Sequence, residues 1–297
     1  MKFAFCDKLD SYLCASYPLL WVQTHEESRA IAEIVGDFYS SAPRPSGQIR
    51  IKRQMYDWDA VRGLSKVELN NRRTPVEGCI PVKKLLDFIE ATKDPRSVFI
   101  VRDFHTFLNE PVVRRAIRNM INQLKGLGTS IIFISPVCAI HEELVKDVQL
   151  LEYALPGEEC IAERLDFVQA AVVATRGADK TAPPSTISPE LKLKAIEAAK
   201  GLTHSEAENA FTLALVENKM FNERFVQTVF GEKIVQVKKN GLLTYLEPDV
   251  TFDQVGGLEG LKIWIRQRGL AYSPAARAYG LPYPRGVLLA GIPGCGS

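Results

Sequence analysis

The sequence has 297 residues, of which 46% are hydrophobic and 24% are charged. These proportions are those of an ordinary soluble globular protein with room for about two domains, and they exclude disordered, collagen-like and coiled-coil chains. Lysine and arginine number 37 against 35 for aspartate and glutamate, so the net charge of +2 gives no general attraction to nucleic acid or to an anionic membrane.

The beginning of the chain differs from a secretion signal. Asp7, Lys8 and Asp10 interrupt its apolar residues, whereas a signal peptide needs a continuous apolar core. No apolar run approaches the roughly 20 residues of a membrane-spanning helix, so we expect a soluble, cytoplasmic protein without a membrane partner. The six cysteines form no Cys-x-x-Cys pair, which favours small buried side chains over a metal site.

Residues 1–174 alternate between short apolar runs and amphipathic stretches, the pattern of βαβ units around a mostly parallel sheet. The expected strands are residues 19–23, an alternating edge strand at 48–55, and buried strands at 97–105, 129–136 and 148–156. The expected helices are residues 24–39, 81–92, 110–128 and 157–174. In the first of these helices, Thr24 and Glu27 have the spacing of a capping box. We therefore expect an α/β fold class for this domain.

A stretch rich in proline, threonine and serine, residues 175–188, predicts a linker or a hinge. Beyond it, over residues 189–248, the pattern is helical only, and strands do not reappear. Thr203 and Glu206 have capping-box spacing at the start of one of these helices. The sequence thus predicts that a small helical bundle, or lid, follows the α/β domain, and that a new and incomplete unit occupies residues 249–297.

The C-terminal region carries four short elements in a fixed order. They are Phe252-Asp253, Val255-Gly256-Gly257-Leu258, Gly280-Leu-Pro-Tyr-Pro-Arg-Gly286, and an apolar run from Val287 into Gly291-Ile292-Pro293-Gly294-Cys295-Gly296. The final glycines allow a sharp turn, and their backbone N–H groups can surround a phosphate. The segment from Gly291 to Ser297 is therefore a candidate nucleotide-binding phosphate loop.

This phosphate loop is incomplete. The pattern G-x-x-x-x-G-K-[ST] requires a lysine after its last glycine, and Ser297 stands there instead. Either the sequence stops with Ser297 in the lysine position, or one codon is absent and Ser297 is the Mg²⁺-binding serine moved up by one. Neither alternative supports ordinary ATP binding, so we expect no catalytic residue, no metal and no cofactor in the chain as given.

This order of motifs resembles the entry of an AAA-type ATPase module. The whole arrangement is similar to an uncharacterised AAA ATPase family of cyanobacteria and algal plastids, the hypothetical chloroplast reading frame forty-six family. The resemblance implies ATP and Mg²⁺ as cofactors of the full-length protein, a ring of identical subunits, an unknown protein substrate or partner, and the plastid stroma if the gene is plastid-encoded. It also implies that Val255, Gly256 and Gly257 lie on the adenine side of the nucleotide.

Residues 1–240 resemble the same module without its phosphate loop. The first strand runs into the segment Thr-His-Glu-Glu-Ser, which has no glycine, and the carboxylates of Glu26 and Glu27 would repel phosphate. Where active modules carry two acidic residues, this chain has Arg102 and Asp103. We therefore expect a degenerate, nucleotide-free AAA-like domain with a P-loop-like parallel sheet. The alternative is an unrelated α/β domain in which Asp103 caps a helix or a loop.

Two smaller features leave alternatives open. Ser135, at the end of a buried strand, matches the polar sensor position of such a module, but serine is also common turn chemistry. Arg114, Arg115 and Arg118 could form a cationic face that reaches a neighbouring subunit's nucleotide, or they could be a solvated helix face.

The leading hypothesis is an AAA ATPase that couples ATP binding and hydrolysis to macromolecular remodelling. The given chain would supply a scaffold or interaction module without hydrolysis. One alternative is a naturally truncated, non-enzymatic partner-binding subunit. Another is a clamp-loader-like DNA ATPase subunit, although the near-neutral charge argues against nucleic acid as a partner.

Overall fold

The computed structural model describes residues 2–40, 51–68, 72–176, 187–239, 254–282, 284 and 286–287 of the chain. The chain divides into two compact units, Met1–Lys239 and Asn240–Ser297, and each is described by itself. The first unit contains a seven-stranded sheet with its covering helices, followed by a helical bundle. No described helix combines the length and the apolar character that a membrane crossing requires.

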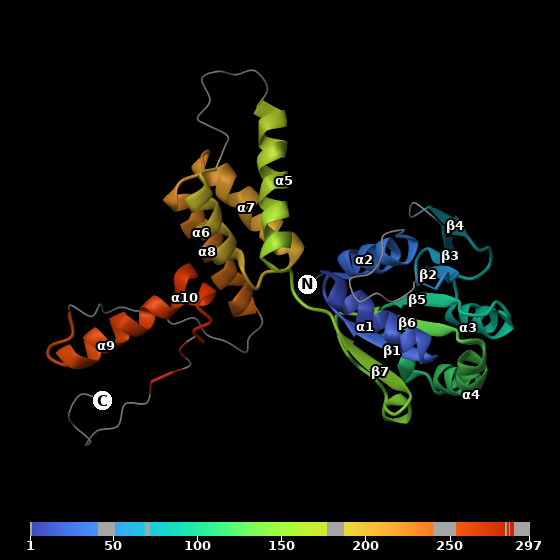
Figure 1. Ribbon diagram of the computed structural model, residues 1–297. Helices are drawn as coiled ribbons and strands as arrows, with labels where there is room; N and C mark the ends of the chain where they lie inside the picture. The colour runs from blue at the N-terminus through green and yellow to red at the C-terminus, as the bar shows by residue number, and fades with distance from the viewer. Residues whose placement is uncertain are drawn as a thin grey trace. The chain divides into compact units, whose positions relative to one another are not determined.

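The sheet has the strand order β4-β3-β2-β5-β6-β1-β7 (Figure 1). The strands are β1 (Leu19–Gln23), β2 (Met55–Asp59), β3 (Gly63–Val67), β4 (Arg73–Pro75), β5 (Val98–Arg102), β6 (Ser130–Ser135) and β7 (Val148–Glu152). All pairs from β2 to β7 along this order are parallel, whereas β2–β3 and β3–β4 are antiparallel. The predicted α/β class with a mostly parallel sheet is confirmed.

Strand β1 lies in the interior of the sheet, between β6 and β7. Trp21 is opposite Phe133 on one side and Leu150 on the other. The first four residues of β1 are all completely buried, because helices cover both faces of the sheet at this strand. A parallel strand that is buried on both faces reads as a continuous apolar run rather than as an alternating one.

Helices cover both faces of the sheet (Figure 1). They are α1 (Lys2–Cys14), α2 (Glu27–Tyr39), α3 (Val82–Ala91) and α4 (Pro111–Leu127). Leu20 and Val22 of β1 point into the core under α1 and α2, and Leu19 and Trp21 point into the core under α3 and α4. Alternate residues of a strand thus serve two separate hydrophobic cores.

The helical bundle has its own core. Its helices are α5 (Glu158–Arg176), α6 (Pro189–Ala199), α7 (His204–Asn218) and α8 (Glu223–Lys239). Leu165, Ala195, Phe211 and Phe225, one from each helix, are completely buried in one cluster. The predicted capping box at the start of α7 is confirmed, because the side chains of the N-cap threonine and of the glutamate three residues later each bond the other's backbone N–H.

The second unit contains two described helices, α9 (Glu259–Gly269) and α10 (Pro274–Ala278). A single turn of 3₁₀ helix, Leu270–Tyr272, joins them. The ammonium group of Lys262, on α9, donates to the carbonyl of Val255 at 2.6 Å and to Glu259 Oε1 at 2.9 Å. These contacts fix the chain as it enters α9.

The expected edge strand at residues 48–55 is wrong. Residues 51–54 are not a strand, residues 48–50 lie outside the described part, and β2 begins only at Met55, inside the sheet. Helix α1 and the antiparallel strands β3 and β4 were not expected from the sequence. The expected linker at 175–188 lies mostly outside the described residues, and α5 continues to Arg176.

Candidate functional site

The carboxyl ends of the parallel strands lie at one edge of the sheet, which is where open α/β sheets bind their ligands. Strand β1 ends at Gln23, β5 at Arg102 and β6 at Ser135. The predicted site residues Arg102 and Asp103 therefore lie at this edge, as does the loop that joins β1 to α2.

Thr24 fixes the short loop between β1 and α2. Its Oγ1 accepts a hydrogen bond from the backbone N–H of Glu26 at 2.9 Å, and its own N–H donates to the carbonyl of Ser135 at 3.0 Å. Helix α2 begins at Glu27 without a side-chain cap. The capping box expected between Thr24 and Glu27 is wrong, because the threonine hydroxyl closes a tighter turn one residue earlier.

The carboxylate of Glu26 joins the sheet region to the helical bundle. Its Oε2 accepts hydrogen bonds from Arg29 Nε and Nη2 at 3.1 and 2.6 Å, and its side chain is only 6% exposed. Its Oε1 accepts a hydrogen bond at 2.6 Å from the backbone N–H of His204, the first residue of α7. Because a helix N-terminus carries a partial positive charge, it stabilises this carboxylate. The anion at the N-terminus of α7 is therefore a side chain of the protein itself, the carboxylate of Glu26.

Arg29 extends the contact to the segment that leads from the sheet to the bundle. Its Nη2 also donates to the carbonyl of Ala154 at 2.6 Å, and its guanidinium lies 4.4 Å from the ring centroid of Tyr153. The Tyr153 hydroxyl donates to Glu33 Oε2 at 2.8 Å. Burial and the hydrogen bond to Glu33 raise the pKa of Tyr153 above its ordinary value, so the phenol keeps its proton and remains a donor.

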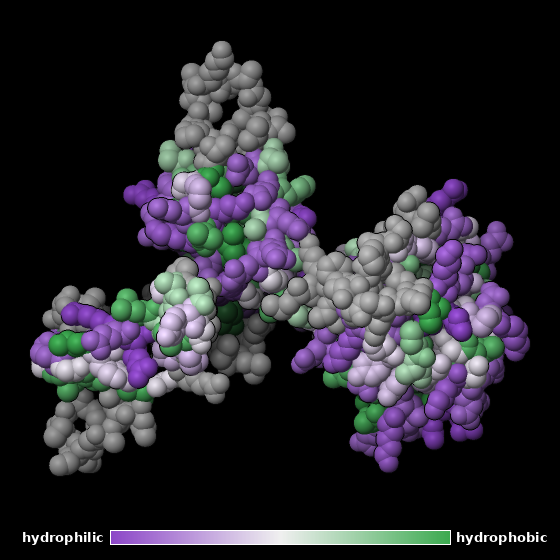
Figure 2. All heavy atoms as spheres, in the orientation of Figure 1, coloured by the Kyte–Doolittle hydropathy of each residue, from purple (hydrophilic) through white to green (hydrophobic). Residues whose placement is uncertain are grey.

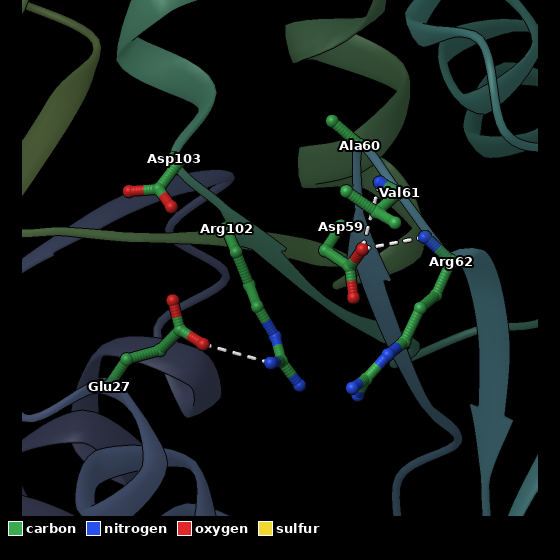
Figure 3. Close-up of a pocket in the computed structure, with 7 residues that line it drawn as sticks. All are labelled: Glu27, Asp59, Ala60, Val61, Arg62, Arg102 and Asp103. Carbon is green, nitrogen blue, oxygen red and sulfur yellow. Dashed lines mark hydrogen bonds and ion pairs between the residues drawn. The ribbon is translucent and has the colours of Figure 1, made fainter.

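Arg102 is held between two carboxylates at the end of β5. Its Nε donates to Asp57 Oδ1 at 2.9 Å and its Nη2 contacts Asp57 Oδ2. Its Nη1 donates to Glu27 Oε1 at 2.8 Å, the contact drawn in Figure 3. Asp57, which is only 3% exposed, also binds Arg73 Nη1 at 2.8 Å. Burial alone would lower the pKa of Arg102, but the hydrogen bond to Asp57 and the charges of Asp57 and Glu27 together raise it. Arg102 is therefore a permanent cation.

Asp103 follows Arg102 in the left-handed backbone conformation, with φ 49°. Its N–H donates to the carbonyl of Ile134 at 2.9 Å, and it precedes the 3₁₀ helix η2 (Phe104–Asn109) without capping it through its side chain. It borders a cavity of about 370 Å³, shown in Figure 3. The cavity is lined by Glu27, Asp59, Ala60, Val61, Arg62, Arg102 and Asp103.

The groups at this edge do not fit a Mg²⁺ site. Mg²⁺ needs an octahedral set of oxygen ligands, usually with one or two carboxylates. Arg102 instead places a guanidinium between the nearby carboxylates, and no metal-binding group of histidine, cysteine, aspartate and glutamate side chains occurs within the described ranges. That Arg102 replaces a catalytic acid stays a prediction.

Three of the remaining predicted residues of the first unit, Ser135, Arg114 and Arg118, have hydrogen-bond partners within the chain. The hydroxyl of Ser135 donates to the carbonyl of Val137 at 2.7 Å, which is turn chemistry. Arg114 Nε and Arg118 Nη1 donate to the two carboxylate oxygens of one glutamate at 3.0 and 3.3 Å, whereas Arg115 is exposed. The three arginines thus do not act as one free cationic face.

The predicted adenine-side segment lies in the second unit, before α9. The carbonyl of Val255 accepts from Lys262, Gly256 is exposed, and Gly257 takes φ +71°, a backbone conformation that glycine adopts without strain. The predicted phosphate loop, Gly291 to Ser297, lies outside the described residues.

Sequence reasoning missed several functional contacts at this edge. Asp57 was not expected to anchor Arg73 and Arg102, and Glu26 was expected only to repel phosphate. One local signal was available for Asp57, since it is a charged residue in the strand Met-Tyr-Asp-Trp-Asp, where it must be paired if it is buried.

Comparison with known proteins identifies the family. Residues 5–153 match the N-terminal domain of SpoVK-like AAA ATPases, and residues 168–240 match the second domain of the same proteins. The chain belongs to the SpoVK-like AAA ATPase family. In this AAA ATPase chain, the first match covers the sheet with helices α2 to α4, and the second covers helices α6 to α8.

Relatives from algae are "uncharacterized AAA domain-containing protein ycf46" from Trieres chinensis and from Guillardia theta. Each is 26% identical to this AAA ATPase chain, over 295 and 288 residues, which is 98% and 96% of the chain. The same alignments cover 54% and 52% of the relatives, so the chain spans about half the length of the curated relatives it matches. The resemblance to the reading frame forty-six family is confirmed.

Among solved structures, the chain is similar to Caenorhabditis elegans PCH-2, with a TM-score of 0.45 and 10% identity over 78% of this chain and 68% of that one. It is also similar to domain III of the replication initiation protein DnaA from Thermotoga maritima, with a TM-score of 0.38 and 12% identity. That match covers 80% of this chain and 90% of the other.

Proposed function

We propose that the first unit is a nucleotide-independent scaffold within an AAA ATPase that remodels another macromolecule. The observation that carries this proposal is the hydrogen bond between the carboxylate of Glu26 and the N-terminus of α7. A helix N-terminus is a natural site for a phosphate. Here a protein carboxylate takes that role, and it connects the sheet to the bundle without a nucleotide.

Electrostatics support the same conclusion. A nucleotide at the end of β1 would bring its phosphates toward the carboxylates of Glu26 and Glu27, which repel them. The N–H of Glu26 is already bonded to Thr24, and Arg102 stands where Mg²⁺ would need an acid. ATP binding at this edge would therefore require the loss of several charge-assisted hydrogen bonds, each contributing about 1.5–3 kcal/mol.

The remainder of the proposal concerns the longer protein. Its relatives are about twice the length of the matched region, and the second unit carries the segment Val255 to Leu258 that resembles the entry of an ATPase module. We place ATP and Mg²⁺ binding, hydrolysis and ring contacts with other copies in that second module. The first unit then supplies a rigid surface for assembly and for a protein partner, in the plastid stroma where the gene is plastid-encoded.

Titration of the full chain with fluorescent methylanthraniloyl-ATP and Mg²⁺ tests the scaffold role. A Gly294→Glu variant, which places a carboxylate in the candidate phosphate loop, separates that loop from the first unit. We expect no saturable binding in this variant, and no change in the unfolding temperature of the first unit on addition of ATP. Saturable binding that persists in Gly294→Glu and is displaced by unlabelled ATP would overturn the proposal.

A further inference from the structure

Three arginines meet in a second cavity beside the one described above. This cavity has a volume of about 250 Å³ and shares Arg62 and Arg102 with its neighbour. Its lining residues are Ser28, Ile31, Ala32, Arg62, Arg73 and Arg102. Figure 3 shows the side chains of Arg62 and Arg102 extending toward one another from the β2–β3 turn and from the end of β5.

Two of the three arginines have carboxylate partners. Asp57 pairs with both Arg73 and Arg102, and Glu27 pairs with Arg102, while Asp59 adds a third negative charge near Arg102. Within the described ranges, the guanidinium of Arg62 has no ion pair. All titratable residues that line the second cavity are cationic, and the guanidinium of Arg62 is the group left to meet an incoming anion.

The cationic groups are held in place before any ligand arrives. Asp59 Oδ1 accepts hydrogen bonds from the backbone N–H groups of Val61 and Arg62 at 2.9 and 2.7 Å, which fixes the β2–β3 turn. Arg102 is bonded through all three of its guanidinium nitrogens, and the anchoring Asp57 is buried. A site whose groups are already held in place loses little conformational entropy when a ligand binds to it.

The size and surroundings of the cavity favour an acidic side chain of a protein. A volume of about 250 Å³ lies below the range of about 300–1,000 Å³ for small-molecule sites. Val61, at the tip of the turn, is 85% exposed and offers an apolar contact beside the charge. The visible face of the α/β part is mostly hydrophilic, with scattered apolar residues (Figure 2).

We infer that the cavity between α2 and Arg62, Arg73 and Arg102 binds a glutamate or aspartate carboxylate of a partner protein. Arginine forks match the geometry of a carboxylate, and the hydroxyl of Ser28 lies on the same wall as a further donor. The choice of a protein partner rests on the proposed scaffold role of this unit. Loops rich in glutamate or aspartate with a neighbouring apolar residue are the class of partner that this surface would select.

Fluorescein-labelled octaglutamate, titrated with the full chain in an anisotropy assay, tests this site. We expect binding that weakens as salt rises, and a loss of affinity of about tenfold in the exposed-charge reversal Arg62→Glu. Arg115→Glu is the matched control, because Arg115 is also an exposed arginine and lies on α4, away from the cavity lining. Octaglutamine at the same concentration controls for contacts that do not need charge.

The site assignment would be overturned if octaglutamate did not bind the chain, or if Arg62→Glu and Arg115→Glu lowered its affinity equally. Inorganic phosphate is the competing ligand. If phosphate raises the unfolding temperature of the wild type but not of Arg62→Glu, while octaglutamate does not bind, the cavity takes a free anion and the peptide assignment fails. Failure of octaglutamate binding leaves the scaffold proposal intact, whereas ATP binding in Gly294→Glu overturns that proposal alone.

Discussion

The carboxylate of Glu26 and the backbone N–H of His204 lie 2.6 Å apart, although 178 residues separate them in the chain. This hydrogen bond connects the residue before α2 to the first residue of α7, so it joins the sheet region to the helical bundle. It is charge-assisted and almost completely buried on the glutamate side. Contacts of this kind are stronger than neutral hydrogen bonds.

Removing the carboxylate should loosen the bundle from the sheet region. In Glu26→Ala, the N–H of His204 loses its acceptor and Arg29 loses its partner, which should cost about 1.5–3 kcal/mol. Hydrogen exchange of the His204 amide should accelerate at least tenfold. The free energy of unfolding, measured with urea, should fall by the same amount, about 1.5–3 kcal/mol. Glu90→Ala is the control, because Glu90 is an exposed glutamate on α3. Equal effects of the two substitutions would rule out the docking role of Glu26.

Arg102 should be needed for stability because it neutralises a buried acid. In Arg102→Leu, the buried Asp57 keeps only Arg73 as a partner, and we expect a loss of about 3 kcal/mol in the free energy of unfolding. The double variant Arg102→Leu with Asp57→Asn should recover part of this loss, because no uncompensated charge is then buried. Urea unfolding of both variants, with Arg115→Leu as an exposed control, measures the effect. A cost no larger than that of Arg115→Leu would disprove the pairing.

The stability of the first unit should depend on pH through His204. Partial burial, together with the positive charge of Arg164, lowers the pKa of His204 below its ordinary value. The unfolded chain therefore takes up this proton more readily than the folded one, so stability is fully present above about pH 6.5 and falls as the pH drops from there through the folded-state pKa.

Urea unfolding between about pH 7.5 and pH 5 should thus show a decline that is smaller in His204→Gln, because glutamine does not titrate. The difference between the two chains isolates this histidine from the acidic groups that titrate lower. Identical pH profiles for the two chains would show that His204 is protonated equally well in the folded and unfolded states.

The β2–β3 turn should require glycine at position 63. Gly63 has φ +76°, and a Cβ there would lie 3.1 Å from the carbonyl oxygen of Cys79, which already accepts hydrogen bonds from Trp58 Nε1 and the N–H of Leu64. Gly63→Ala should therefore lower the free energy of unfolding by about 2 kcal/mol. Gly36→Ala, in α2 with open space around it, should instead be neutral or stabilising by up to about 1 kcal/mol. Similar unfolding midpoints for both variants would contradict this reading of the turn.

Much of the sheet could be predicted because its buried parallel strands are continuous apolar runs. Strand β1 was expected at the residues where it occurs, and the expected ranges contain β5, β6 and β7. Strand β2 was misplaced because Asp57 and Asp59 break its apolar pattern, while the residues before it alternate. Burial of Asp57 depends on Arg73 and Arg102, which come from other strands and cannot be identified as its partners from the local sequence.

For the site, as for the sheet, local features could be read from the sequence, but contacts between distant segments could not. The absence of glycine after β1 and the presence of Arg102 are local facts, and both predict that this edge does not bind a nucleotide. The use of Glu26 as a ligand for α7 was not predictable, because it depends on how a distant helix is placed in the tertiary structure. The cavity of three arginines likewise assembles from separate strands and a turn.

The position of β1 in the sheet has a consequence for biosynthesis. Leu19–Gln23 is made early, yet its partners are β6 and β7, which end at Ser135 and Glu152. At about 5–20 residues per second, a ribosome needs roughly ten seconds to make the chain between β1 and β7. Until β6 has been made, both edges of this largely apolar strand are open to other chains, and the edge that pairs with β7 stays open longer. The sheet can close around β1 only when its last parallel strand, β7, has emerged.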